Sequence, residues 1–120
     1  MANNPNKGIK RLLNAMVFSW QGIKAAYKHE EAFRQEVLLF MVAVPLAFWL
    51  GNSPLETGLM ISSVILVLIV EILNSAIEAV VDRFGGEIHE LSGRAKDMGS
   101  AAVTLSLLNA AIIWLFIIIS

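Results

Sequence analysis

Long apolar segments separated by short polar ones dominate this chain. The run VLLFMVAVPLAFWL is too short to span a bilayer by itself, and extension back to position 32 gives the roughly 20 residues that a span needs. A second apolar segment covers 54–84, about 45 Å as a helix, which exceeds the hydrocarbon core. A third covers 92–119. The pattern predicts an all-α integral membrane protein, one domain of residues 1–120 with three transmembrane helices.

Residues 6–28 precede the first span and have the pattern of an amphipathic helix. Apolar side chains recur on one face at helical spacing: Ile9, Leu12, Leu13, Met16, Trp20, Ile23 and Tyr27. An apolar stripe with Trp and Tyr, backed by Lys and Arg, is typical of a helix lying in the headgroup plane. The alternative is an ordinary surface helix on a soluble core. The scarcity of other polar elements favours the interfacial interpretation.

A start signal precedes the second span. Ser53 suits a helix cap, Pro54 suits the first helical position, and Glu56 completes a capping box with Ser53. Gly85 and Gly86 are the expected end of this helix.

Composition agrees with a membrane protein and excludes some chemistry. The apolar fraction is 57% and the mean hydropathy is +0.68, whereas soluble domains have roughly 45–50% apolar residues. The absence of cysteine excludes disulfides and thiol chemistry. The net charge of −1 gives no argument for a nucleic acid partner. The polar N-terminus predicts no cleavable signal peptide, so we expect the first span to be retained.

Basic residues predict the orientation. All nine Lys and Arg lie in 7–34 or 83–96, and none lies in the 51–58 turn or near the C-terminus. Because basic loops stay on the inner side of a membrane, we expect a cytoplasmic N-terminus and an external C-terminus.

The second span carries the candidate chemistry. One narrow helix face holds Glu71, Asn74, Ser75, Glu78 and Asp82. Glu71 and Glu78 lie about 20° apart around the helix and about 10 Å apart along it. A carboxylate near the bilayer centre costs on the order of 2.5–3.5 kcal/mol, so such a row is unlikely to arise by chance. Glu71 alone has a structural alternative, a protonated side chain bonded to Asn109 or Thr104. The presence of all five polar residues on one face favours a functional role over a structural one.

Other charged residues flank this face at the cytoplasmic boundary. Glu30 and Glu36 precede it, and Glu87, His89, Lys96 and Asp97 follow it. Several carboxylates with few histidines suit a hard ion such as Mg²⁺, and Lys96 and Arg11 are candidates for holding phosphate oxygens. The alternative is a solvated loop with ordinary ion pairs, which is favoured for His89 taken alone. The common nucleotide motifs G-x-x-x-x-G-K-[ST], G-x-G-x-x-G and H-R-D are absent.

Two long motifs carry a family resemblance. The segments VEILNSAIEAVVDRF (70–84) and HELSGRAKDMGSAAV (89–103), with AFRQE (32–36), resemble the prokaryotic diacylglycerol kinases, in the Gram-negative branch, over essentially the whole chain. The resemblance implies a homotrimeric, multi-pass kinase of the bacterial inner membrane with sites shared between subunits. It implies transfer of the γ-phosphate of MgATP to the sn-3 hydroxyl of 1,2-diacylglycerol, giving phosphatidic acid.

The resemblance also implies residue roles. Glu71 matches the general base, and Glu30 and Glu78 match the ligands of Mg²⁺. Positions implied to bind ATP are Arg11, Phe18, Glu30, Glu78, Asp82, Glu87, Ile88, His89, Lys96 and Asp97. Positions implied to bind the lipid are Trp20, Arg34, Gln35, Glu36, Trp49, Leu50, Gly51, Asn52, Glu71, Asn74 and Ser100. Two positions depart from the family: Phe18 stands where relatives can have tyrosine, and Asn14 where a basic residue can occur.

Two competing hypotheses remain at this stage. One is an undecaprenol kinase, with the same chemistry on a long isoprenoid alcohol. The other is a small oligomeric carrier of protons or cations that uses Glu71 and Glu78 as relays. A carrier has no need of Lys96 and Asp97, which favours the kinase hypotheses.

Overall fold

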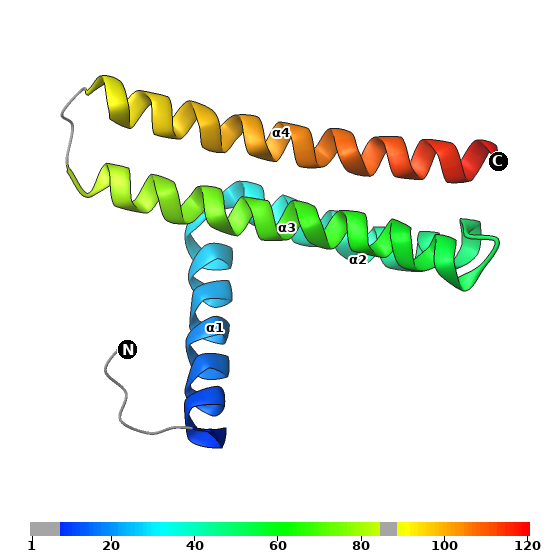
Figure 1. The fold of residues 1–120 in the computed structure, drawn as a ribbon, viewed down its shortest axis with the longest axis horizontal. Coiled ribbons are helices and arrows are strands. Elements are labelled where there is room, and N and C mark those ends of the chain that lie inside the picture. Colours follow the sequence, from blue (N-terminus) through cyan, green and yellow to red (C-terminus); the bar gives the residue numbers. More distant parts are fainter. Residues whose placement is uncertain (1–7, 85–88) are drawn as a thin grey trace.

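The computed structural model describes residues 8–84 and 89–120, which form four helices. α1 spans Ile9–His29, α2 Glu31–Leu50, α3 Pro54–Asp82 and α4 Glu90–Ile119. The last three run along the longest dimension of the molecule, and α1 stands across them (Figure 1). Each of these three is long and apolar enough to cross a membrane. The predicted all-α fold with three candidate spans is therefore confirmed.

The two ends of the bundle differ. At one end α1 joins α2, α3 ends and α4 begins, and we call this the α1 end. At the other, the turn end, residues 51–53 connect α2 to α3 and the C-terminus lies nearby (Figure 1). α3 ends at Asp82, short of the predicted glycines, because the N–H groups of Arg83 and Phe84 turn back onto Ala79 O and Val81 O, both at 3.2 Å. Gly85, Gly86, Glu87 and Ile88 lie outside the described residues, as does Lys7.

The start of α3 has the predicted cap, with one difference. Ser53 Oγ accepts from Glu56 N–H at 3.2 Å, whereas the Glu56 carboxylate accepts from Asn52 N–H at 2.9 Å and not from Ser53. Thr57 Oγ1 donates to Ala47 O at 3.2 Å and ties α3 to the end of α2. A Cβ at Gly51 would lie only 2.9 Å from Ala47 O, so this turn needs glycine for space. The turn end is thus closely packed by local contacts.

α3 is the central helix of the described bundle, and it packs against both α2 and α4. Its buried side chains form one continuous face: Thr57, Met60, Ser63, Val64, Val67 and Glu71. Met60, Ala47 and Ile117 bring the three helices together near the turn end. Trp114 Nε1 donates to Met60 O at 3.1 Å and Ser63 Oγ at 3.2 Å, which binds α4 to α3.

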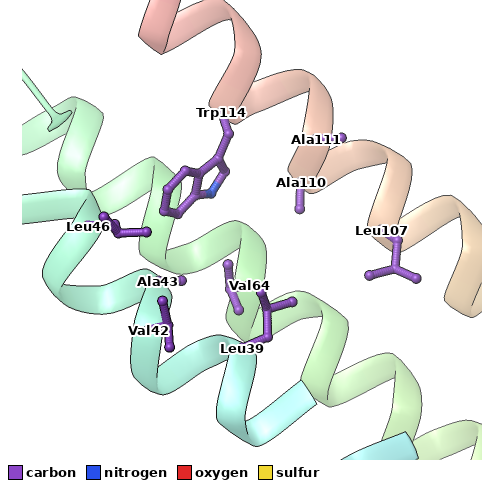
Figure 2. A pocket seen from close by; sticks show the side chains of 9 residues that line it. All are labelled: Leu39, Val42, Ala43, Leu46, Val64, Leu107, Ala110, Ala111 and Trp114. Atoms are coloured by element: carbon purple, nitrogen blue, oxygen red, sulfur yellow. The ribbon is translucent and has the colours of Figure 1, made fainter. Parts of the chain in front are cut away.

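An apolar groove of about 240 Å³ lies between α2 and α4, with α3 at its base. Figure 2 shows the Trp114 indole extending from α4 toward Leu46 of α2 at one end of this groove. The other lining residues are Leu39, Val42, Ala43, Val64, Leu107, Ala110 and Ala111. The lining of this groove therefore offers hydrocarbon surface and almost no polar atoms.

α4 packs tightly against the Asn74 side chain of α3 at Gly99. A Cβ added there would overlap Asn74 Oδ1 and would lie 3.2 Å from Asn74 Cγ. Gly93, two turns earlier on α4, has nothing within 4 Å of such an atom. Only one of these glycines is therefore required by the packing.

We predict that Gly99→Ala lowers the free energy of unfolding in micelles by up to about 1 kcal/mol, because moving the Asn74 side chain outweighs the gain from alanine in a helix. The matched variant Gly93→Ala should leave it unchanged or raise it by about 0.5–1 kcal/mol, because alanine favours a helix interior. Denaturant titration followed by circular dichroism measures both. Equal behaviour of the two variants would contradict the close α3–α4 contact.

Candidate active site

The polar face of α3 becomes steadily more exposed toward the α1 end. Glu71 is buried, with 4% of its surface exposed. Asn74, Ser75 and Glu78 are half-buried, and Asp82 is exposed. Since an α-helix rises 1.5 Å per residue, this row covers roughly 16 Å. It connects the interior of an apolar bundle with the surface at the α1 end.

Glu71 meets another acid, Glu36 of α2. The two carboxyl groups lie close enough to interact electrostatically. The alternative partners considered from the sequence are not those found. Thr104 Oγ1 donates to Ser100 O at 3.1 Å, and Asn109 is exposed. The structure thus places two acids, from two different helices, at the deep end of the polar face.

Three buried polar atoms near this pair have no hydrogen-bond partner among the described residues: Glu36 Oε2, Asn74 Oδ1 and Ser75 Oγ. An unsatisfied buried polar group costs about 1–3 kcal/mol, and such groups are rare unless they serve a function. All three lie within about one helical turn of the level of Glu71. Together they offer unused acceptors and a hydroxyl to a polar ligand.

The shallow end of the face gathers charge of both signs. Lys96 Nζ of α4 lies 2.8 Å from Asp82 Oδ1 of α3. The Glu78 carboxyl is within electrostatic range of Glu30, Lys96 and Asp82. Glu30 is the residue at the break between α1 and α2, so four segments of the chain contribute to this cluster. The acids outnumber Lys96 there, which favours binding of a further cation.

The chemistry of this cluster fits Mg²⁺. In 8–84 and 89–120, no three acidic or histidine side chains gather closely enough to form a metal cage by themselves. Mg²⁺ is usually held by one or two carboxylates and completes its shell with water and phosphate oxygens. Glu30 and Glu78 provide such a pair.

A small cavity of about 310 Å³ separates α1 from α3 beside this cluster. Glu30 lines it, with Ser75 and Ala79 on the opposite wall. The remaining lining residues are mostly small: Gly22, Ala25, Ala26, His29, Ile72 and Ala76. The α1 part of this lining was not singled out from the sequence, although its glycine and alanines recur at helical spacing.

Other predicted residues have different surroundings. His89 Nδ1 caps α4 by accepting from Leu91 N–H at 3.0 Å, which leaves Nε2 as the nitrogen that carries a proton. Asp97 and Ser100 are exposed on α4, and Gln35 is exposed on α2. The guanidinium of Arg34 contacts backbone carbonyls of α1.

Two predicted groups do not join the cluster within one chain. Arg11, Phe18 and Trp20 are exposed on α1, whose far end stands away from the bundle (Figure 1). Arg11 is about 28 Å along the chain axis from Glu30. Trp49, Leu50, Gly51 and Asn52 lie at the turn end, about 20 Å or more from Glu36 along α2. The candidate base and the candidate metal ligands lie on or beside the polar face of α3, whereas the α1 residues and the turn-end residues are distant from it.

Comparison with known proteins gives a consistent result. The family model "Prokaryotic diacylglycerol kinase" matches residues 17–118. A diacylglycerol kinase of Escherichia coli K12 is 57% identical over 114 residues, covering 95% of this chain and 93% of that protein. The Haemophilus influenzae diacylglycerol kinase is 53% identical, covering 89% and 91%. The Pseudomonas aeruginosa diacylglycerol kinase is 50% identical, covering 99% of both chains.

These matches include the polar face of α3, the Lys96 region of α4 and the break at Glu30, and they confirm the resemblance carried by the sequence motifs. The chain belongs to the prokaryotic diacylglycerol kinase family.

Proposed function

We propose that this protein transfers the γ-phosphate of MgATP to the sn-3 hydroxyl of 1,2-diacylglycerol, giving phosphatidic acid. Family membership carries the kinase activity and the lipid acceptor. The observation that carries the mechanism is the buried acid Glu71, with the graded polar face between it and the cluster at the α1 end. That face joins a lipid environment to an aqueous one, as the two substrates require.

Glu71 acts as the general base in this proposal. The acceptor hydroxyl is neutral, so a carboxylate within hydrogen-bond reach takes its proton as the oxygen attacks phosphorus. Asn74 and Ser75, with unpartnered polar atoms one turn away, orient the single glycerol hydroxyl for this transfer. Glu36 contacts the base directly and lies on the same side.

The cluster at the α1 end holds the nucleotide. Phosphoryl transfer needs mainly positioning and neutralisation of charge. Lys96 faces the phosphates, with Asp82 fixing its ammonium group at 2.8 Å. Glu30 and Glu78 hold Mg²⁺, which when bound neutralises phosphate oxygens. Arg11, Phe18, Glu87, Ile88, His89 and Asp97 complete the proposed ATP contacts.

The proposed site lies at the cytoplasmic face of the bacterial inner membrane. Basic residues concentrate at the α1 end, which by the positive-inside rule is cytoplasmic, so the C-terminus is periplasmic. Exposed apolar side chains of α1, among them Leu12, Met16 and Trp20, lie in the headgroup region. Trp49, Leu50, Gly51 and Asn52, at the turn end, then line the path of the acyl chains.

We further propose a homotrimer with shared sites. Arg11 and Phe18 lie far from Glu78 within one chain, and α1 stands free over most of its length. In the proposed trimer, Arg11 and Phe18 of one subunit reach the nucleotide held by a neighbouring subunit, and no subunit has to change its fold.

A carrier finds little support. Beyond Glu71 toward the turn end, the same face of α3 continues with the buried residues Val67, Val64 and Met60. The one buried polar side chain on this stretch, Ser63, is already bonded to Met60 O and Trp114 Nε1, so the stretch gives an ion no free ligand across the bundle.

The deciding assay gives the purified protein labelled ATP and Mg²⁺ in mixed micelles with diacylglycerol or undecaprenol. We expect labelled phosphatidic acid. Faster phosphorylation of undecaprenol would transfer the assignment to that acceptor, and no labelled lipid with either would refute both kinase hypotheses.

Glu71→Gln should lower kcat by about 10²–10⁴-fold, because the amide has no basic oxygen for the hydroxyl proton. The KM for ATP should change by less than about threefold, since Glu71 lies deep in the bundle. Glu90→Gln, which removes an exposed acid paired only with exposed Arg94, is the matched control and should keep full turnover. Near-normal turnover of the Glu71 variant would remove its role as base.

Glu78→Gln should raise the Mg²⁺ concentration needed for half-maximal rate by about tenfold or more, since it removes one of two carboxylate ligands. Titration of the initial rate with Mg²⁺ at fixed ATP measures this shift. An unchanged titration, with Glu90→Gln again as control, would exclude Glu78 as a ligand.

A further inference from the structure

Arg34 has a contact that its family assignment does not explain. Its Nη1 donates to Tyr27 O at 2.8 Å and to Lys28 O at 3.1 Å. Both carbonyls are in the last turn of α1, where carbonyls have no partner within the helix. Glu30 N–H already satisfies Ala26 O at 2.9 Å. Arg34 thus completes the cap of α1 from the first turn of the next helix.

The contact fixes the corner between α1 and α2. Glu30 is the single extended residue of this corner, with φ −117° and ψ 111°. On its far side Arg34 N–H bonds to Glu30 O at 3.3 Å, while the Arg34 side chain reaches back over Glu30 to α1. A guanidinium also suits the negative end of a helix dipole. Arg34 therefore bonds to the chain on both sides of the corner: its backbone N–H bonds to Glu30 O, and its guanidinium bonds to the end of α1.

The position of Glu30 depends on that corner. No glycine or proline in the corner sets its conformation, and Glu30 has no side-chain cap contact of its own. Beyond the corner, α1 has few contacts with α3, and a cavity lined by Ala26, Ser75 and Ala79 lies between the two helices. A change in the α1–α2 angle would therefore displace the Glu30 carboxylate from Glu78.

We propose that Arg34 is a positioning residue: it locks the α1–α2 corner and so holds Glu30 beside Glu78 for the divalent cation. This inference rests on the proposed metal role of Glu30 and Glu78. It differs from direct lipid binding by Arg34, which predicts a change in lipid affinity instead.

The first test uses kinetics. Arg34→Gln should raise the Mg²⁺ concentration for half-maximal rate by about tenfold, as loss of a group that orients a ligand does. The KM for diacylglycerol should change less than about twofold. Arg34→Lys keeps the charge, but its shorter side chain places the ammonium nitrogen less well for the two carbonyls that Nη1 contacts, so an intermediate shift is expected. Arg94→Gln, from the exposed pair with Glu90, is the matched control. A raised lipid KM with normal Mg²⁺ dependence would overturn the proposal.

A double-mutant cycle with Glu30→Gln separates positioning from general destabilisation. If Arg34 acts through Glu30, the double variant should have the same Mg²⁺ dependence as Glu30→Gln alone. Additive shifts would overturn the proposal while the metal site stands. If neither single variant shifts the Mg²⁺ dependence, the proposed metal site fails, and the inference fails with it.

The corner is also measurable without metal or activity. The chain has no cysteine, so nitroxide labels at Val17→Cys and Leu38→Cys, both exposed, report the α1–α2 distance. Labelled chains diluted with excess unlabelled chains give the distance within one chain. Arg34→Gln should broaden this distribution and Arg94→Gln should not. An unchanged distribution in the Arg34 variant would show that the lock does not exist.

Discussion

Hydrocarbon offers no partner to a carboxyl group, so an acid within a membrane-spanning helix has to be satisfied by protein. Glu71 is buried in the bundle with a second acid, Glu36 of α2, close to it, where α2 packs against α3. Glu36 lies on the same stripe of α2 as the buried residues Phe33, Ala43 and Ala47, because successive members are three, seven and four residues apart. The contact between two acids and the apolar packing of α2 on α3 are consequently parts of one interface.

The other side of α3 follows from the same constraint. The polar residues beyond Glu71 must be shielded from lipid and still be reachable from water. α4 allows both, because it has no side chain at Gly99, where it packs against α3. Asn74 occupies the space so left, and Lys96, one turn away on α4, reaches the exposed Asp82. The tightly packed contact of Gly99 with Asn74 and the exposed ion pair of Lys96 with Asp82 thus lie next to each other along α4. The first keeps the deep acids enclosed, and the second admits a soluble ligand.

Much of this organisation could be predicted from the sequence, because it depends on the helical repeat and on hydrogen bonds between residues close together in the chain. The spacing from Glu71 to Asp82 places those residues on one helix face whatever surrounds them. Ser53 and Glu56 mark the start of α3 by a bond across three residues. The contact of Glu36 with Glu71 depended on helix packing, which no periodicity specifies. The corner at Glu30 was equally hidden, because a side chain four residues later, not a glycine or proline, stabilises it.

The division of the bundle into two halves follows from the substrates of such a kinase. A diacylglycerol molecule has most of its bulk in hydrocarbon, and its one reactive hydroxyl lies at the interface. Near the turn end the bundle offers an apolar groove and a core fastened by Trp114, and no acid lines that groove. The acids begin at Glu71, where a hydroxyl can arrive while its acyl chains remain in the membrane. ATP never has to leave water, because the charges that would hold it lie at the other end of the same face, near Glu78.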